Sequence, residues 1–199
     1  MKKRQRGDDL LTPDALLDAY SVGIFPMGDE DTDEIFWFRP DPRAIIPLGE
    51  FHISRRLRRT MRQERFEITY NRAFSEVMAG CAARSPVWIT PRIHRAYTRL
   101  FEVGRAHSVE VWQQKTLAGG LYGVQLGGAF VAESKFHRVT DASKVALAKL
   151  VERLLGRGFR ILEVQYLTDH LKRLGAREIP LYEYLRDLRD VANLDCRFD

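Results

Sequence analysis

The clearest structural pattern in the sequence is HSVEVWQQKTLAGGLYGVQLGGAFVAESKF, residues 107–136. Apolar and polar residues alternate in three runs, residues 107–114, 117–125 and 129–136, and a period of two is typical of β-strands. Lys115-Thr116 and Gly127-Gly128 separate the runs, and two-residue connections of this kind are typical of hairpins. The stretch therefore predicts an antiparallel meander of three strands.

The flanking sequence predicts helices around this meander. Asp141 begins an amphipathic stretch that runs to about residue 155, a strand follows at 159–167, and residues 168–174 and 181–190 have helical patterns. Upstream, residues 66–70 are typical of a strand, and residues 71–83 and 91–103 of helices. A meander followed by helix, strand and helix is an α+β layout with helices covering a mixed sheet. We place a lobe boundary near Arg65, which divides a small N-terminal lobe (1–65) from a larger domain (66–199).

The composition excludes several classes of protein. The chain has 199 residues, of which 45% are hydrophobic and 30% charged, as in a folded globular protein, and its net charge of +5 permits a nucleic-acid partner. No stretch approaches the ~20 apolar residues of a membrane span, and the N-terminus lacks the apolar core of a signal peptide. The two cysteines are far apart and favour a reducing compartment, so we expect a cytoplasmic protein.

Familiar cofactor motifs are absent from the sequence. The five histidines show no metal-ligand spacing, and there is no G-x-G-x-x-G after a strand, no Walker loop and no G-x-S-x-G elbow. We therefore predict no metal and no cofactor.

Glu163 and Gln165 are the strongest candidates for chemistry. Residues two apart on a strand face the same side, so these two side chains project together while Val164 faces the other layer. A carboxylate beside an amide could accept a proton and orient an electrophile. A polar, solvated face of an edge strand explains the pair equally well.

The third strand of the meander and the helix after it carry further polar groups. Glu133, Lys135 and His137 alternate with Ser134 and Phe136, so Glu133 could bind a cation or pair with Lys135. The helix that begins at residues 141–144, DASK, could receive a phosphate or a ribose at its free N–H groups, although an ordinary cap is the commoner use of such a start.

A basic helix is predicted after Ser54, its expected N-cap. Six arginines lie between positions 55 and 65, and four of them follow helical spacing along one face: Arg55, Arg58, Arg59 and Arg62. That face suits a phosphate backbone, and a merely solvated face is the alternative. The aromatic residues Trp37, Phe38, Trp88 and Trp112 could line an apolar pocket or stack on bases, or each could belong to the core.

Ordered motifs along nearly the whole chain resemble a known family. They are GIFPM (23–27), Trp37 with PDPRA (40–44), HISR (52–55), WIT (88–90), AHSVEVW (106–112), GGLYGV (119–124), DASK (141–144) and LGA (174–176). In this order they resemble the leucyl/phenylalanyl-tRNA–protein transferases. The resemblance implies a small N-terminal lobe and a C-terminal lobe with the GNAT acyltransferase fold.

The resemblance also implies an activity. Members of this family transfer Leu or Phe from aminoacyl-tRNA to the α-amine of proteins that begin with Arg or Lys, which marks those proteins for degradation; Met is a further expected donor. Residues 137–141, HRVTD, are not the glycine-rich pyrophosphate loop of an acetyl-CoA enzyme, which fits a donor other than CoA. An aminoacyl ester is already activated, so positioning should supply much of the rate.

Residue roles follow from the matched positions. Glu163 stands at the family Asp of an Asp-Cys-Gln motif and Gln165 at its Gln, which implies that Glu163 draws the proton from the amine, directly or through water, while Gln165 orients the amine or the ester carbonyl. Glu133 matches a family Glu and would hold the acceptor's amine or basic side chain. The donor's apolar side chain would lie among Trp88, Phe136, Phe38 and Trp37. The tRNA would contact Arg55, Arg58, Arg59, Arg62 and Ser143.

The chain departs from the family at several of these positions. Glu163 is one methylene longer than Asp, and Val164 replaces Cys. Ala132 and Lys135 replace Gly and Met, and a Lys135 on the face of Glu133 would pair with it or repel a basic acceptor. Two other classes remain open: a GNAT-like N-acyltransferase with a small thioester donor, and a non-catalytic tRNA-binding relative.

Overall fold

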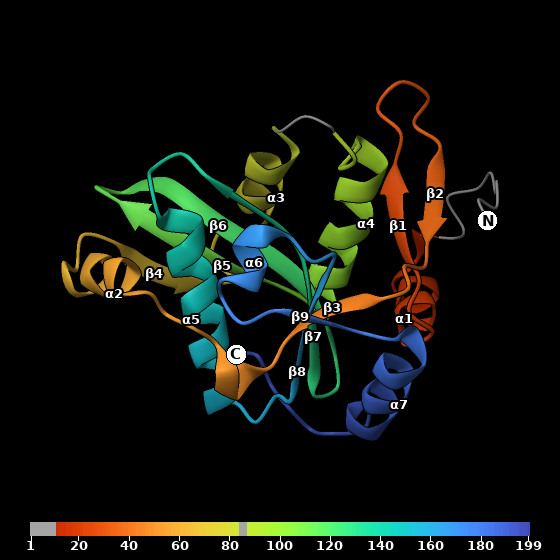
Figure 1. The fold of residues 1–199 in the computed structure, drawn as a ribbon. Coiled ribbons are helices and arrows are strands. Elements are labelled where there is room, and N and C mark those ends of the chain that lie inside the picture. The colour runs from red at the N-terminus through yellow and green to blue at the C-terminus, as the bar shows by residue number, and fades with distance from the viewer. Residues whose placement is uncertain (1–10, 84–86) are drawn as a thin grey trace.

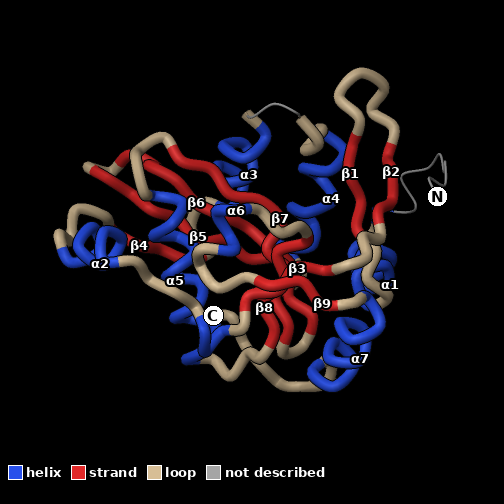
Figure 2. The backbone as a smooth tube through the Cα atoms, in the orientation of Figure 1, coloured by secondary structure: helices blue, strands red, loops and turns tan. Residues whose placement is uncertain are grey.

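A computed structural model describes residues 11–83 and 87–199. Within them, seven strands form one mixed sheet in the order β4-β5-β6-β7-β8-β3-β9 (Figures 1 and 2). The strands are β3 (Arg43–Ile46), β4 (Glu67–Tyr70), β5 (Ala106–Gln113), β6 (Thr116–Leu126), β7 (Ala129–His137), β8 (Ile161–Gln165) and β9 (Arg177–Ile179). Neighbouring strands are antiparallel except for β7 and β8, which are parallel. The predicted meander is confirmed as β5, β6 and β7.

Helices cover both faces of this sheet, as the α+β layout predicts (Figure 1). On one face, α5 (Ala142–Gly156), α6 (Asp169–Lys172), α2 (Arg55–Arg62) and the short 3-10 helix η2 (Leu48–Glu50) share a core cluster with Leu121 of β6. On the other face, α1 (Pro13–Ser21), α3 (Phe74–Ala82) and α4 (Pro91–Glu102) share a second cluster with Tyr122. Leu121 and Tyr122 are neighbours in sequence, so the alternation of side chains along β6 separates the two cores.

The helices α2 and α5 both begin where the sequence predicts, but only α2 has the expected side-chain cap. Ser54 accepts a hydrogen bond from the backbone N of Leu57 at 3.2 Å, which caps α2 as expected. Asp141 precedes α5 in a left-handed conformation (φ 70°), and its side chain makes no capping bond. Its carboxylate instead lies 2.9 Å from Lys144 Nζ and 3.6 Å from Arg56 Nε. The two cations therefore replace the backbone N–H groups as its partners.

The first third of the chain contributes to both sheets. Strands β1 (Phe25–Gly28) and β2 (Ile35–Phe38) form a separate antiparallel hairpin near α1 (Figure 1). β3, which follows the hairpin, lies inside the large sheet between β8 and β9, and α7 (Leu181–Val191) packs near α1. The division of the chain into domains at residue 65 stays a prediction. None of the helices in the described ranges is long and apolar enough to cross a membrane.

Candidate active site

The candidate site lies where the parallel strands β7 and β8 part. Their pairing extends from Ala129 opposite Ile161 to Val131 opposite Glu163. Directly beyond this point, the register of β7 on β6 shifts by one residue at Glu133, and the register of β8 on β3 shifts at Val164. Such bulges redirect side chains and are frequent beside active sites. The fork therefore brings side chains from two strands to one place.

Glu133 of β7 is buried among hydroxyl and amide donors. Its side chain is 7% exposed, and Tyr20 of α1 donates to Oε1 at 2.6 Å while Gln165 Nε2 donates to Oε2 at 3.0 Å. The hydroxyl of Tyr97 on α4 contacts Oε2 at 3.5 Å and is hydrogen-bonded to that of Tyr20. Burial raises the pKa of Glu133 to about 8, against the hydrogen bond from Tyr20, which lowers it. Hydrogen bonds thus hold the carboxyl group of Glu133 in place, and its pKa lies well above the ordinary value for Glu.

Glu163 of β8 is completely buried and paired with Arg43 of β3. Arg43 Nη2 lies 3.0 Å from Glu163 Oε1, so the two side chains form an ion pair. The N–H of Nη2 does not point at this oxygen, and the contact is therefore not a hydrogen bond. The same oxygen accepts the backbone N–H of Gln165 at 2.9 Å. Burial raises the pKa of Glu163 to about 7, although the charge of Arg43 lowers it. One oxygen of Glu163 therefore already has two partners.

Gln165 connects the two carboxyl groups. Its backbone binds Glu163 and its side chain binds Glu133, and its φ of 63° ends the strand at this residue. Val164 lies on the opposite face, as the alternation predicts, and contacts the core beneath α5. An amide side chain between two carboxyl groups can orient an incoming amine by a hydrogen bond. The charge of the buried carboxylate then acts on the amine through that amide. The site is suited to acyl transfer to an amine.

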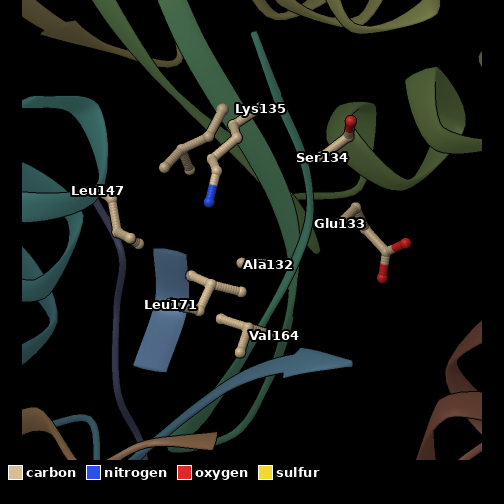
Figure 3. A pocket seen from close by; sticks show the side chains of 8 residues that line it. Ala132, Glu133, Ser134, Lys135, Leu147, Val164 and Leu171 are labelled. Carbon is tan, nitrogen blue, oxygen red and sulfur yellow. The ribbon is translucent and has the colours of Figure 1, made fainter. Parts of the chain in front are cut away.

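A cavity of about 200 Å³ opens on the other face of the fork (Figure 3). The apolar side chains that line it are Leu121, Ala132, Leu147, Val164 and Leu171, and the polar residues that line it are Glu133, Ser134 and Lys135. Figure 3 shows the ammonium group of Lys135 pointing into the cavity, whereas the carboxylate of Glu133 points away from it. The expected shared face of Glu133 and Lys135 is therefore wrong. Ser134 pairs with Tyr122 and Ala132 with Gly123, so Glu133 is an extra residue without a partner position on β6. The simple alternation of side chains along β7 is therefore interrupted at Glu133.

The four predicted aromatic residues gather on the face of Glu133. Trp37, Phe38 and Trp88 are half-buried against the cluster that contains Tyr20 and Tyr97, and Phe136 is buried within it. Phe136 packs so closely beneath α3 that a Cβ at Gly80 would lie 2.6 Å from its ring. None of the four lines the cavity of Figure 3. Their part in binding the donor stays a prediction.

The four predicted arginines of α2 share one surface. Arg55, Arg58, Arg59 and Arg62 are exposed and line one shallow hollow. Their neighbour Arg56 reaches Asp141 at the beginning of α5, so this surface continues to that helix end. Ser143 lies there but is buried, and its hydroxyl lies 3.4 Å from His137 Nδ1. The geometry brings the arginines together and leaves Ser143 little exposed surface.

Sequence reasoning missed Arg43, Tyr20 and Tyr97. Tyr20 lies one helical turn after Leu16, and Tyr97 one turn after Ile93, so both follow the apolar stripe of their helices and look like ordinary core residues. Arg43 belongs to the quoted motif PDPRA, and a charged residue directly before the apolar residues 44–46 was a further signal. Within the described ranges, no group of three or more His, Cys, Asp or Glu residues is placed to bind a metal.

Comparison with solved structures gives likenesses of fold. FemX superposes with a TM-score of 0.51 at 13% identity, covering 88% of this chain and 70% of that one. A GCN5-related N-acetyltransferase-like protein from Streptococcus suis is a further similar structure, with a TM-score of 0.44 and 13% identity over 83% of this chain and 63% of that one. At 13% sequence identity, these two likenesses indicate a similar fold and nothing about activity.

Comparison of sequences reaches further. The protein from Salinibacter ruber named leucyl/phenylalanyl-tRNA–protein transferase is 56% identical over 172 residues, which cover 86% of this chain and 76% of that protein. A protein of the same name from Gloeobacter violaceus is 50% identical over 94% of this chain and 97% of its own length. The family description leucyl/phenylalanyl-tRNA protein transferase matches residues 45–189, and its N-terminal domain matches residues 9–41. The chain belongs to the leucyl/phenylalanyl-tRNA–protein transferase family.

Proposed function

We propose that this protein transfers Leu, Phe or Met from aminoacyl-tRNA to the α-amine of proteins that begin with Arg or Lys. The observation that carries the proposal is the buried Glu133–Gln165–Glu163 group at the β7–β8 fork, which adjoins an apolar cavity. Aminoacyl-tRNA is a cytoplasmic substrate, so we place the reaction in the cytoplasm. The products would carry a new N-terminal residue that marks them for degradation.

The reaction needs little chemical activation. The amine nitrogen attacks the ester carbonyl carbon, the C–N bond forms, and the C–O bond to the terminal ribose breaks. The amine releases one proton and the departing ribose oxygen takes one up. A reference pKa of about 8 leaves part of the α-amine neutral at cellular pH, so holding amine and ester together supplies much of the rate.

The two carboxyl groups have different parts in this proposal. Glu133 adjoins the fork and would hold the positive amine or the basic side chain of the acceptor. Burial raises its pKa to about 8, and a cation beside it would favour the ionised form. Glu163 has no exposed surface and one oxygen committed to Arg43 and Gln165. Its charge therefore acts on the amine through Gln165, which orients the attacking nitrogen.

The donor approaches from the other face. Its apolar side chain enters the cavity between β7 and α5, and the tRNA extends past the beginning of α5 toward the arginines of α2. Arg55, Arg58, Arg59 and Arg62 contact phosphates there, so tRNA binding weakens as salt rises. Trp37, Phe38, Trp88 and Phe136 form the wall of the site on the side of Glu133.

The direct test measures transfer of labelled Leu and Phe from charged tRNA to peptides that differ only in their first residue. We expect transfer to peptides beginning with Arg or Lys, and loss of transfer with retained tRNA binding in Glu163→Gln. Glu178→Gln on the exposed strand β9 is the matched control and should retain full activity. Tight tRNA binding without transfer to any peptide would contradict the proposal and favour the non-catalytic alternative. Acylation from acetyl-CoA alone would favour the thioester alternative.

A further inference from the structure

Arg43 on β3 is completely buried, and an arginine is rarely buried without several partners. Its strand lies inside the sheet, between β8 and β9. The carbon of its guanidinium lies 5.6 Å from the centre of the Phe25 ring and 4.8 Å from the centre of the Tyr184 ring. Aromatic rings from β1 and α7 therefore hold this cation by cation–π contacts.

Two nitrogens of this guanidinium reach different parts of the chain. Nη1 donates to the carbonyl of Gly23 at 3.0 Å, and Nη2 lies 3.0 Å from Oε1 of Glu163. Because the guanidinium is planar and rigid, the two contacts fix Glu163 relative to the turn before β1. A lysine ammonium is a single point charge, so it lacks this fixed pair of contacts.

Stability does not account for this arrangement. Four buried polar atoms have no hydrogen-bond partner among the described residues: Arg43 Nε and Nη2, Glu163 Oε2 and the hydroxyl of Tyr184. A buried ion pair with incompletely paired atoms is often no more stabilising than apolar side chains of the same volume. Groups that break the rule of complete pairing are instead expected at functional sites.

The position of Glu163 is passed on to Gln165. Oε1 of Glu163 accepts the backbone N–H of Gln165 at 2.9 Å. Gln165 has a φ of 63°, a left-handed conformation that a residue with a side chain keeps only where its surroundings hold it. In this conformation Nε2 of Gln165 reaches Oε2 of Glu133 at 3.0 Å. Contacts therefore connect the guanidinium with the amide that the proposed function places beside the attacking amine.

We infer that Arg43 is a positioning residue for acyl transfer: it holds Glu163, and through Glu163 it orients Gln165 toward the attacking amine. This inference rests on the proposed function. Arg43 has no exposed surface on which a substrate could bind. Its loss should therefore lower kcat and leave the KM values for tRNA and peptide nearly unchanged.

The position of Gln165 can be measured without turnover. In two-dimensional NMR spectra, the amide proton of Gln165 reports its charge-assisted hydrogen bond to Glu163. We expect Arg43→Met to shift this signal upfield and to speed its exchange with solvent, and Arg43→Lys to shift it less. Leu150→Ala is the matched control for lost stability and should leave the signal unchanged, because Leu150 lies in a buried cluster that contains neither Phe25 nor Tyr184.

Transfer of labelled Leu to a peptide that begins with Arg measures the consequence for catalysis. We expect kcat to fall about 10²-fold in Arg43→Met, because a small misplacement of reacting groups has an effect of this size. Arg43→Lys should recover part of the loss, since it retains the positive charge. Leu150→Ala loses stability, and Arg177→Met loses the charge of an exposed arginine on β9. Both controls should retain the kcat of the wild type.

A double variant tests whether Arg43 acts through Glu163. If it does, Arg43→Met/Glu163→Gln should have the residual rate of Glu163→Gln alone, to within about twofold, in single-turnover reactions with excess enzyme. The double variant also replaces Arg43→Met if that protein fails to fold, because it leaves no unpaired charge.

The results separate the inference from the proposed function. A Gln165 signal that moves in Arg43→Met, together with a fall of kcat at unchanged KM, supports the inference. An unchanged Gln165 signal, a loss of kcat no larger than that of Leu150→Ala, or additive losses in the double variant would overturn it and leave the proposed function intact. Absence of transfer by the wild type would overturn the proposed function, and the inference with it.

Discussion

The two faces of the β7–β8 fork handle polar groups in opposite ways. On one face, Glu133 is surrounded by donors from three elements: Tyr20, Tyr97 and Gln165. On the other, Lys135 enters an open cavity among leucines. A filled hydrogen-bond network holds a side chain in one position, whereas a cavity leaves room for a ligand. The fork therefore separates a side held by polar contacts from a side with room for a ligand.

The rigid side extends to the N-terminal third of the chain. Arg43 pairs with Glu163 and also donates to the carbonyl of Gly23 at 3.0 Å, so one guanidinium connects the turn before the β1–β2 hairpin with strand β8. Its guanidinium carbon lies 4.8 Å from the centre of the Tyr184 ring. A shift of this segment would therefore be transmitted to Glu163.

The largest expected effect comes from breaking that ion pair. Arg43→Met leaves Glu163 buried without its cationic partner, and we expect the free energy of unfolding in urea to fall by about 3–5 kcal/mol. The double variant Arg43→Met/Glu163→Gln removes the unpaired charge and should recover part of the loss. The exposed control is Arg177→Met. If Arg43→Met lowered the free energy of unfolding by less than this control, the ion pair would not hold this face of the fork rigid.

The cavity side should tolerate truncation better than the core beside it. Leu150→Ala on α5, in the closed core, should lower the free energy of unfolding by about 2–5 kcal/mol. Leu147→Ala lies one turn earlier at the cavity and should lower it by about 2 kcal/mol or less, because this side chain loses fewer contacts. Urea titration of the two variants measures the difference. Equal losses would show that the cavity wall is as tightly packed as the core.

Removing the hydroxyl of Tyr20 tests whether its hydrogen bond, and not burial alone, fixes the carboxyl group of Glu133. Tyr20→Phe removes the 2.6 Å bond to Glu133 and should cost about 1–3 kcal/mol while lowering the transfer rate. Tyr122→Phe is the matched control, because the buried hydroxyl of Tyr122 has no hydrogen-bond partner among the described residues. Its effect on stability should stay within about 0.5 kcal/mol. Similar losses of stability in both variants would show that the hydrogen bond from Tyr20 does not hold Glu133 in place.

The last prediction concerns pH. Burial raises the pKa of Glu133 to about 8, so the folded protein retains a proton that the unfolded chain loses near pH 4.5. The corresponding stability is fully present below pH 4.5 and is lost as pH rises through about 8, so Tm should fall over that range. Transfer should rise over the same range, because ionised Glu133 attracts the acceptor.

Glu133→Gln tests this pH dependence. The variant should show a smaller decrease of Tm between pH 5 and 8.5 than the wild type, since it lacks the titrating group. An unchanged slope would assign the effect to other carboxyl groups, Glu163 first among them.

Local patterns were sufficient for much of the fold and for the family. The alternation along residues 107–136 predicted β5, β6 and β7, and Ser54 predicted the beginning of α2, because each depends on neighbours a few residues away. The helical spacing of Arg55, Arg58, Arg59 and Arg62 likewise predicted their common surface. Motifs spread along the chain were enough to indicate the family, since their order needs no knowledge of contacts.

The partners of the site residues could not be read in this way. Tyr20 and Glu133 are 113 positions apart, and no local pattern distinguishes that tyrosine from a core residue. The cap expected at Asp141 failed for a similar reason, because Arg56 comes from a distant helix and engages the carboxylate together with Lys144. Contacts between elements decide which of several possible hydrogen bonds a side chain makes.

Periodicity and motif order are properties of consecutive residues, and they predicted the meander, the strands and helices beside it, the basic face and the candidate carboxylates. They did not predict the strands β1, β3 and β9. Only the tertiary structure decided that Glu133 and Lys135 face opposite sides, that Arg43 neutralises Glu163, and that the cavity lies beside Lys135. The physical reason is the bulge at Glu133: one extra residue reverses the facing of every later side chain on the strand, and its position is set by pairing with β6.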